Sequence, residues 1–293
     1  MNYEIYADVS IDIDADFMKE HPIHFIPMEY MLGEETFHCT APESDEAMHH
    51  YYERLRQKET THTSQITPSH YVELFEPLVK EGKAILYLSL SSGLSDTYSS
   101  ANVAVNQLKE DYDNVQIEVV DSLGATGGMG LLAEAAIENH NKGMSLEENA
   151  SWLRENAVNI QYWFKVEDLM YLMRGGRVSA TTAIFGTALN IKPILTIDST
   201  GHLQTIDKKR GNKLAMKALL DHFKETYDET LGSTVYICCS DCLKEAGQLK
   251  EALLSENPNL TVRTTMLSPI IGAHTGPDML ALIHFGRGRN DEG

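Results

Sequence analysis

Basic residues are scarce in this 293-residue chain. It has 24 Lys and Arg against 43 Asp and Glu, which gives a formal net charge of −19. Nucleic-acid binding depends on Lys and Arg that neutralise phosphates, so this composition argues against a nucleic-acid partner. It also disfavours docking on an anionic membrane surface. We interpret the acidic excess as a solvated surface that keeps the protein in solution.

Long apolar runs are also absent. No stretch approaches the roughly 18 residues that a membrane-spanning helix needs. The first eight residues lack the basic and apolar regions of a secretory signal peptide. We therefore expect a cytoplasmic protein with no membrane span. Hydrophobic residues make up 42% of the chain, enough for a sizeable core and, at this length, for about two domains.

Cysteine is rare, with four in the chain. Cys239 and Cys242 have the C-x-x-C spacing of redox and zinc sites, but no second pair of this kind and no paired histidines complete a zinc set. Cys238 and Cys239 end the apolar run Val235–Ile237, so we interpret them as buried strand residues in a reducing compartment. We expect neither a metal nor another cofactor.

The common catalytic and nucleotide-binding motifs are missing. The sequence contains no nucleophile elbow, no Walker loop and no dinucleotide fingerprint. The glycine-rich segment 124–130 does not have the G-x-G-x-x-G spacing, and we expect it to allow close packing of a helix instead. The polar residues of this chain suit holding an anion better than breaking a bond.

Strand and helix patterns alternate along the chain, which is typical of α/β proteins. The segment Ala84–Leu90 is almost entirely apolar, as expected for a strand of a parallel sheet that is buried on both faces. Thr67 and Pro68 predict the start of a helix in which Pro77 causes a kink or an early break. Paired strands are expected on either side of Gly201.

We predict two α/β domains, the first with a mostly parallel sheet. The pattern changes near residue 158, which divides the chain into an N-terminal domain, 1–158, and a C-terminal domain, 159–293. Polar turns between a strand and a helix expose backbone N–H groups and the positive end of the helix dipole. Such turns border the crevice where α/β proteins bind ligands.

Two of these turns are the strongest anion-binding candidates, Thr63–Gln65 and Ser92–Ser95. Their hydroxyl groups can donate hydrogen bonds to a carboxylate or a phosphate. Ser95 could equally cap the helix that follows it, and the two roles can coexist.

Other polar residues have weaker signals. Asp8 and Asp121 end strands, and we favour a role in tying down loops over a role as bases. Arg174 and Arg177 lie on a glycine turn that could fork around an anion. His274 follows an expected strand end at Pro269–Ile271; it could donate to a carboxylate or act as a base, although a lone histidine is more often structural.

Taken in order, these motifs resemble the DegV family. The resemblance extends from residue 3 to about residue 285. It is carried by the following segments: Asp8–Ser10, Thr63–Gln65, Ser91–Ala101, Asp121–Ser122, Asp168–Arg177, Leu189–Ile194, Lys209–Gly211 and Gly272–Pro277.

The resemblance implies a long-chain fatty acid in a deep tunnel between the two domains. Its carboxylate would lie at the Thr63 and Ser95 turns, with His274 in the hydrogen-bond network. Related bacterial proteins are acyl-carrying subunits of fatty acid kinase, in which a separate ATP-dependent subunit phosphorylates the carboxylate for phospholipid synthesis. Arg177 and Arg210 match positions that hold the head group or contact that kinase. The ligand-binding candidates are Thr63, Ser64, Ser92, Ser95, Arg177, His274 and Gly276.

Two other functions stay open. A stand-alone hydrolase or acyltransferase would use Ser95 as nucleophile and His274 as base, and a sensor would bind a different small anion. One position also departs from the family, because Asp96 stands where a glycine is usual. An acid in the first helical turn favours the helix dipole, but it would repel a carboxylate if its side chain turned inward.

Overall fold

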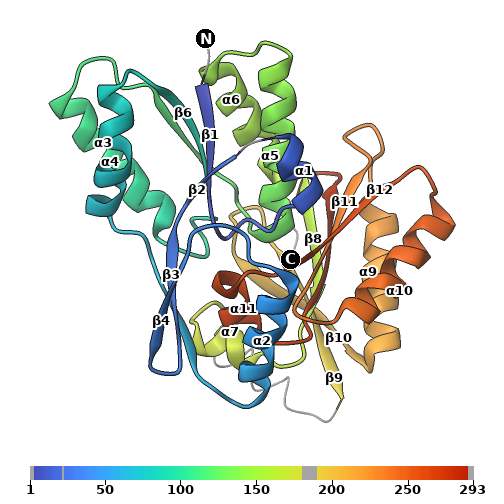
Figure 1. Cartoon of the computed structure of the whole chain (residues 1–293). Coiled ribbons are helices and arrows are strands. Elements are labelled where there is room, and N and C mark those ends of the chain that lie inside the picture. Colours follow the sequence, from blue (N-terminus) through green and yellow to red (C-terminus); the bar gives the residue numbers. More distant parts are fainter. Residues whose placement is uncertain (1–2, 22, 180–189, 290–293) are drawn as a thin grey trace.

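The fold is taken from a computed structural model that describes residues 3–21, 23–179 and 190–289. Within these residues the strands form three β-sheets, and helices pack against them (Figure 1). No described helix is long and apolar enough to cross a membrane. Leu189, the first residue of the 189–194 motif, lies outside the described residues.

The first sheet has four parallel strands in the order β2-β1-β6-β7. Strand β6 is buried along its whole length, as its apolar sequence predicts. The expected α/β fold with a parallel first sheet is therefore confirmed. The strands are β1 (Tyr3–Asp8), β2 (His24–Ile26), β6 (Ala84–Ser89) and β7 (Ile117–Asp121).

Helices cover both faces of this sheet (Figure 1). They are α3 (Pro68–Lys80) and α4 (Thr97–Asp111) on one face, and α5 (Thr126–Asn141) and α6 (Leu146–Asn156) on the other. The Thr67 hydroxyl caps α3 by accepting from the His70 N–H, as predicted. Pro77 does not break α3, because only the last turn follows it and one backbone hydrogen bond is lost.

The largest sheet has six strands in the order β10-β9-β8-β13-β11-β12. All neighbours are antiparallel except β11 and β12, and β9 and β10 form the hairpin predicted around Gly201. The strands are β8 (Ile160–Lys165), β9 (Ile191–Ile197), β10 (Leu203–Arg210), β11 (Thr234–Cys239), β12 (Thr261–Met266) and β13 (Leu280–Phe285).

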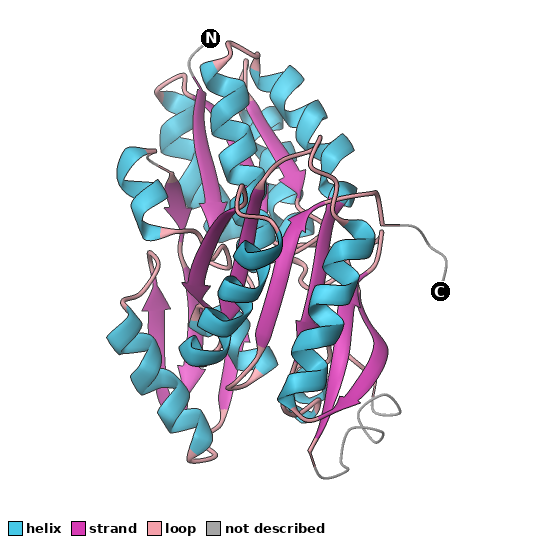
Figure 2. Ribbon diagram, turned by 90° about the vertical axis from the view of Figure 1, so that its right-hand side faces the viewer, coloured by secondary structure: helices cyan, strands magenta, loops and turns pink. Residues whose placement is uncertain are grey.

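Two long helices, α9 (Asn212–Thr226) and α10 (Leu243–Glu256), lie on the outer side of this sheet. Figure 2 views the molecule from that side and shows helices in front of the strands. Every strand of this sheet follows residue 159, and the described strands of the other sheets precede residue 158. The division into domains 1–158 and 159–293 stays a prediction.

The smallest sheet is antiparallel, with the order β4-β3-β5. Its strands are β3 (Met28–Leu32), β4 (Glu35–Cys39) and β5 (Thr61–Ser64), and the remaining helices are α1 (Ala15–Glu20), α2 (Asp45–Arg56), the 3₁₀ helix η1 (Ala157–Asn159), α7 (Met170–Arg174) and α11 (Pro269–Thr275). Helix α11 packs against β3, β5, α2 and α7, so residues late in the chain contact the smallest sheet.

Two expectations were wrong. The apolar segment Pro269–Ile271 begins helix α11 and does not end a strand, because Ser268 and Pro269 form the same helix-start signal as Thr67 and Pro68. Thr63 and Ser64 do not lie in a turn before a helix. They belong to strand β5, which pairs with β3 in the smallest sheet.

Helix α5 lies between the parallel sheet and the six-stranded sheet (Figure 1). Its glycines make this close approach possible. A methyl group added to Gly128 would lie 2.0 Å from the Tyr162 hydroxyl, and one added to Gly127 would lie 2.7 Å from Cys238 Sγ. The glycine-rich segment 124–130 therefore allows close helix packing, as predicted.

Candidate ligand-binding site

A cavity of about 650 Å³ is lined by residues of the six-stranded sheet and the smallest sheet, by the loop after β6 and by residues of α5, α7 and α11. This volume is within the usual range for small-molecule sites. Of the predicted ligand-binding residues, the cavity lining includes Thr63, Ser64, Ser92, Ser95, Arg177 and His274. Gly276 and Arg210 are not among the lining residues.

Most of the remaining wall is apolar. The six-stranded sheet contributes residues from β8, β9, β10 and β13, and the smallest sheet, the helices and the loops contribute the rest. The sequence did not predict which apolar residues line the cavity. A signal was present in β8, because Tyr162 and Phe164 occupy alternate positions and therefore share the strand face toward the cavity. The apolar lining residues include Met28, Leu90, Leu172, Ile197, Ile270, Met279, Ala281 and Ile283.

The polar part of the lining is organised around Thr63 and His274. Strand β5 carries the Thr63 hydroxyl and α11 carries the His274 imidazole, and Oγ1 and Nε2 lie 2.9 Å apart. The other ring nitrogen, Nδ1, is buried and has no hydrogen-bond partner among the described residues. It faces Gly175, where an added methyl group would lie only 2.2 Å away.

The imidazole of His274 is neutral at neutral pH. Burial first, and then the nearby charges of Arg177 and His62, lower its pKa to about 4. A buried N–H without an acceptor is rarer than an unused lone pair, so we assign the ring proton to Nε2. His274 then donates to Thr63 Oγ1, and the Thr63 hydroxyl hydrogen is left to donate into the cavity.

The serine-rich loop after β6 forms another part of the polar wall. Ser95 Oγ lies 2.8 Å from Thr97 Oγ1 and accepts the Thr97 N–H, so Ser95 supports the start of α4 as well as lining the cavity. The Ser91 hydroxyl donates to the Gly201 carbonyl at 2.9 Å. This bond joins the loop to the β9–β10 hairpin of the six-stranded sheet.

Asp8 and Asp121 tie down loops beside the cavity, as we favoured from the sequence. Asp8 is fully buried and accepts the Leu90 N–H at 2.8 Å, and burial raises the pKa of its carboxyl. Asp121 accepts the Ser92 N–H at 3.1 Å and the Leu123 N–H at 3.0 Å. Both carboxylates therefore fix the backbone that carries the serines.

Arg177 brings a positive charge to the polar wall. Its Nε donates to the Leu94 carbonyl at 2.9 Å, and Nη1 donates to the Gly175 carbonyl. Burial lowers its pKa, and the charge of Asp96 opposes this shift. Asp96 is exposed and also lines the cavity, so it lies where its charge acts on both Arg177 and a bound anion.

The two predicted residues outside the lining have other surroundings. Gly276 ends α11 with φ +72°, and a methyl group added there would lie 2.5 Å from the Tyr171 ring. It therefore sets how closely α11 and α7 pack. Arg210 is exposed at the end of β10.

Ser95 and His274, the nucleophile and base of the hydrolase alternative, each have another partner. Among the described residues, Ser95 and His274 make no hydrogen bond to each other, because Ser95 Oγ is bonded to Thr97 and His274 Nε2 to Thr63. A nucleophile and its base normally lie within hydrogen-bond reach. The lining provides hydroxyl, imidazole and guanidinium groups that suit holding an anion beside apolar side chains.

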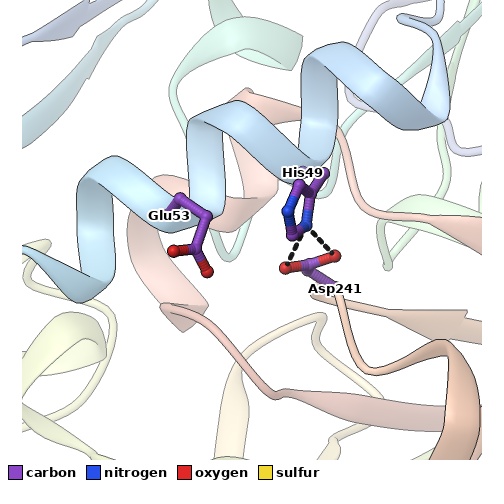
Figure 3. Close-up of side chains that lie close together, drawn as sticks. All are labelled: His49, Glu53 and Asp241. Carbon is purple, nitrogen blue, oxygen red and sulfur yellow. Dashed lines mark hydrogen bonds and ion pairs between the residues drawn. The ribbon is translucent and has the colours of Figure 1, made fainter.

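One group of side chains elsewhere has metal-ligating types: His49, Glu53 and Asp241 (Figure 3). Figure 3 shows Asp241 facing His49, whose Nδ1 lies 3.0 Å from both carboxylate oxygens. The carboxylates are already paired with a cation, because Arg56 Nη1 lies 2.5 Å from Asp241 and 2.8 Å from Glu53. The group links α2 to the segment after β11.

The cysteines are all free and buried, which agrees with their interpretation as strand and core residues. Cys242 donates from Sγ to the Met279 carbonyl at 3.1 Å.

The chain is similar to known proteins over nearly its whole length. A family model described as "Uncharacterised protein, DegV family" matches residues 2–286. The chain belongs to the DegV family. A DegV domain-containing protein of Lactococcus lactis is 33% identical over 287 residues, which cover 98% of this chain and 99% of the relative. One of Clostridium perfringens is 32% identical over 284 residues, 97% of each chain.

Solved structures show the same fold. DegV of Bacillus subtilis, described as a fatty acid binding protein, has a TM-score of 0.82 and 28% identity, and covers 98% of this chain and 100% of that one. The fatty acid kinase B3 protein of Streptococcus pneumoniae, loaded with linoleic acid, also has a TM-score of 0.82, at 23% identity and with 97% and 99% of the two chains covered.

Proposed function

We propose that this DegV-family chain binds a long-chain fatty acid in the 650 Å³ cavity and presents its carboxylate to a separate ATP-dependent kinase subunit. One observation carries the proposal: the cavity is lined both by many apolar side chains and by the polar groups of Thr63, Ser95 and His274. An amphipathic molecule with a single anionic head group fits this distribution. The family relationship to fatty-acid-binding proteins supports the same choice.

The acyl tail supplies most of the affinity in this proposal. Each methylene removed from water contributes about 0.8 kcal/mol, so a long chain gains more from the cavity wall than from its head group. The hydroxyls of Thr63, Ser64, Ser92 and Ser95 then orient the carboxylate, with Arg177 as the nearby cation. Gly276 acts indirectly, by setting the position of α11 and hence of His274.

The chemical step belongs to the partner. A carboxylate oxygen of the bound fatty acid attacks the γ-phosphorus of ATP, ADP leaves, and an acyl phosphate remains on this chain. The chain itself contributes binding and orientation and no catalytic group. The exposed Arg210 is our candidate contact with the kinase subunit, and the need for ATP places the reaction in the cytoplasm.

Native mass spectrometry of the purified protein tests the proposal, followed by denaturation and identification of the released lipid. We expect one fatty acid per chain. A protein that is empty, and that also fails to bind added palmitate and oleate, would contradict the proposal. A stoichiometric small anion without an acyl chain would support the sensor alternative instead.

A further inference from the structure

A second, smaller cavity of about 150 Å³ adjoins the polar wall of the first. The two cavities share Thr63, Arg177 and His274 in their linings. A ligand group held by these three side chains in the larger cavity is therefore adjacent to the smaller one. The proposed function uses only the larger cavity, so the smaller one is left without a role.

The smaller cavity has a positive balance of charge in a chain whose net charge is −19. Arg174, at the end of α7, and Arg177, in the turn that follows, both line it. Among the described residues Arg174 makes no ion pair. The carboxylate in the lining, Glu59, is already held by Arg54, whose Nε and Nη2 lie 2.7 and 2.6 Å from its two oxygens.

The other lining residues and the size of the cavity narrow the choice of ligand. Strand β5 contributes Thr61, His62 and Thr63 to the lining, and the Thr61 hydroxyl also lies 3.2 Å from the Tyr51 hydroxyl. Guanidinium and hydroxyl groups together are the usual partners of a phosphoryl group. A volume of about 150 Å³ is below the usual range for a whole small molecule, so a nucleotide does not fit while a single anionic group does.

We infer that the smaller cavity binds the phosphoryl group of an acyl phosphate whose acyl chain fills the larger cavity. This inference rests on the proposed function. Phosphorylation lengthens the head group and increases its negative charge at the end where the cavities meet. The product would then gain contacts with Arg174 that the fatty acid does not make, and the chain would hold the acyl phosphate after its kinase partner has left.

Stable probes make the inference testable with the purified full chain. Hexadecylphosphonate stands in for the acyl phosphate, because its carbon–phosphorus bond does not hydrolyse, and palmitate stands in for the fatty acid. The measured quantity is the ratio of the two affinities. We expect R174Q to lower the affinity for the phosphonate relative to palmitate about tenfold, the usual scale of one charge-assisted hydrogen bond. R174K, which keeps the charge without the planar fork, is expected to fall between R174Q and wild type.

The matched control is R154Q, which removes the same charge from an exposed arginine on α6 paired with Glu118. It should leave the ratio at the wild-type value. An unchanged ratio in R174Q, or an equal change in R154Q, would overturn the inference while palmitate binding still supports the proposed function. If inorganic phosphate binds beside palmitate and R174Q abolishes this, the cavity is a free-phosphate site and the assignment to an acyl phosphate is wrong. Failure of wild type to bind palmitate would overturn the proposed function and this inference with it.

Discussion

The Thr63 hydroxyl and the His274 imidazole are hydrogen bonded at 2.9 Å, although one lies on a strand of the smallest sheet and the other on a helix near the end of the chain. The bond fixes the direction of the Thr63 hydroxyl. Since His274 is neutral and donates from Nε2, Thr63 has its own hydrogen to offer to a ligand. The buried histidine thus orients the Thr63 hydroxyl so that it can donate a hydrogen bond to a ligand.

Replacing Thr63 with Val keeps the shape of the side chain and removes this donor. We expect the affinity for palmitate to fall about ten- to hundredfold, since a hydrogen bond to a charged group contributes about 1.5–3 kcal/mol and the tail contacts are unchanged. Competition binding measures the loss. The affinity for hexadecanol, which has no carboxylate, should fall less.

The control is Thr205→Val, which makes the same change at an exposed position of β10, outside the cavity. It should bind palmitate like wild type. An equal loss of palmitate and hexadecanol affinity in Thr63→Val would show that Thr63 shapes the cavity and does not hold the head group.

How much of this site the sequence predicts depends on how local each signal is. Strand β6 and the start of α3 are predicted correctly, because an apolar run and a Thr-Pro cap act over a few residues. The segment Pro269–Ile271 was misassigned, since three apolar residues show no period that separates a strand from a helix.

The contacts within the site are not local, and spacing alone could not place them. His274 meets Thr63 only because α11 packs on β5, far from it in the sequence. The resemblance to a family placed Thr63, Ser95 and His274 in one hydrogen-bond network, without the direct bond between Thr63 and His274. The apolar residues of the wall, such as Phe164 and Ile283, were not predicted, because buried sheet residues look alike in sequence whether they face a core or a cavity.

The low pKa of His274 predicts a pH-dependent contribution to stability. The folded protein keeps this histidine neutral down to about pH 4, whereas its ordinary pKa is 6.5. Between these values the unfolded chain binds more protons, so acid favours unfolding through this group. This loss of stability is absent above pH 6.5 and grows as the pH falls. It is complete near pH 4, where it lowers the free energy of unfolding by a few kcal/mol.

Urea unfolding of wild type and His274→Gln at several pH values isolates this contribution. The free energy of unfolding of wild type, relative to the variant, should fall as the pH is lowered from 7 to 4.5. Using the difference removes the effects of other buried groups, such as Asp12, whose burial raises its pKa to about 7 and acts in the opposite direction. A difference that is constant with pH would show that His274 titrates normally.

The apolar wall predicts control of chain length. Ala281 lies on β13 with 1% of its surface exposed, and it lines the cavity. A larger side chain at this position occupies space that the acyl chain would fill. We therefore expect Ala281→Leu to carry shorter fatty acids than wild type, as identified by mass spectrometry of the released lipid.

Extra volume in a packed core usually costs about 1–3 kcal/mol of stability, so the melting temperature is measured alongside. Ala15→Leu makes the same change at an exposed position of α1 and should leave the lipid profile as it is in wild type. A profile that is unchanged in folded Ala281→Leu would place the acyl chain elsewhere.

Asp96 should weaken the binding of fatty acids. It lines the cavity as an exposed carboxylate, and its charge acts on Arg177, the cation of the polar wall. Asp96→Asn removes the negative charge and keeps a residue that is favoured at the start of a helix. We expect the affinity for palmitate to rise about two- to fivefold at low salt, the scale of an exposed charge interaction. The gain should shrink as added salt screens the charges.

Asp111→Asn, an equal change at the opposite end of α4, is the control and should have little effect on palmitate binding. If Asp96→Asn binds palmitate no better than Asp111→Asn at any salt concentration, the Asp96 carboxylate points away from the head group and does not affect its binding.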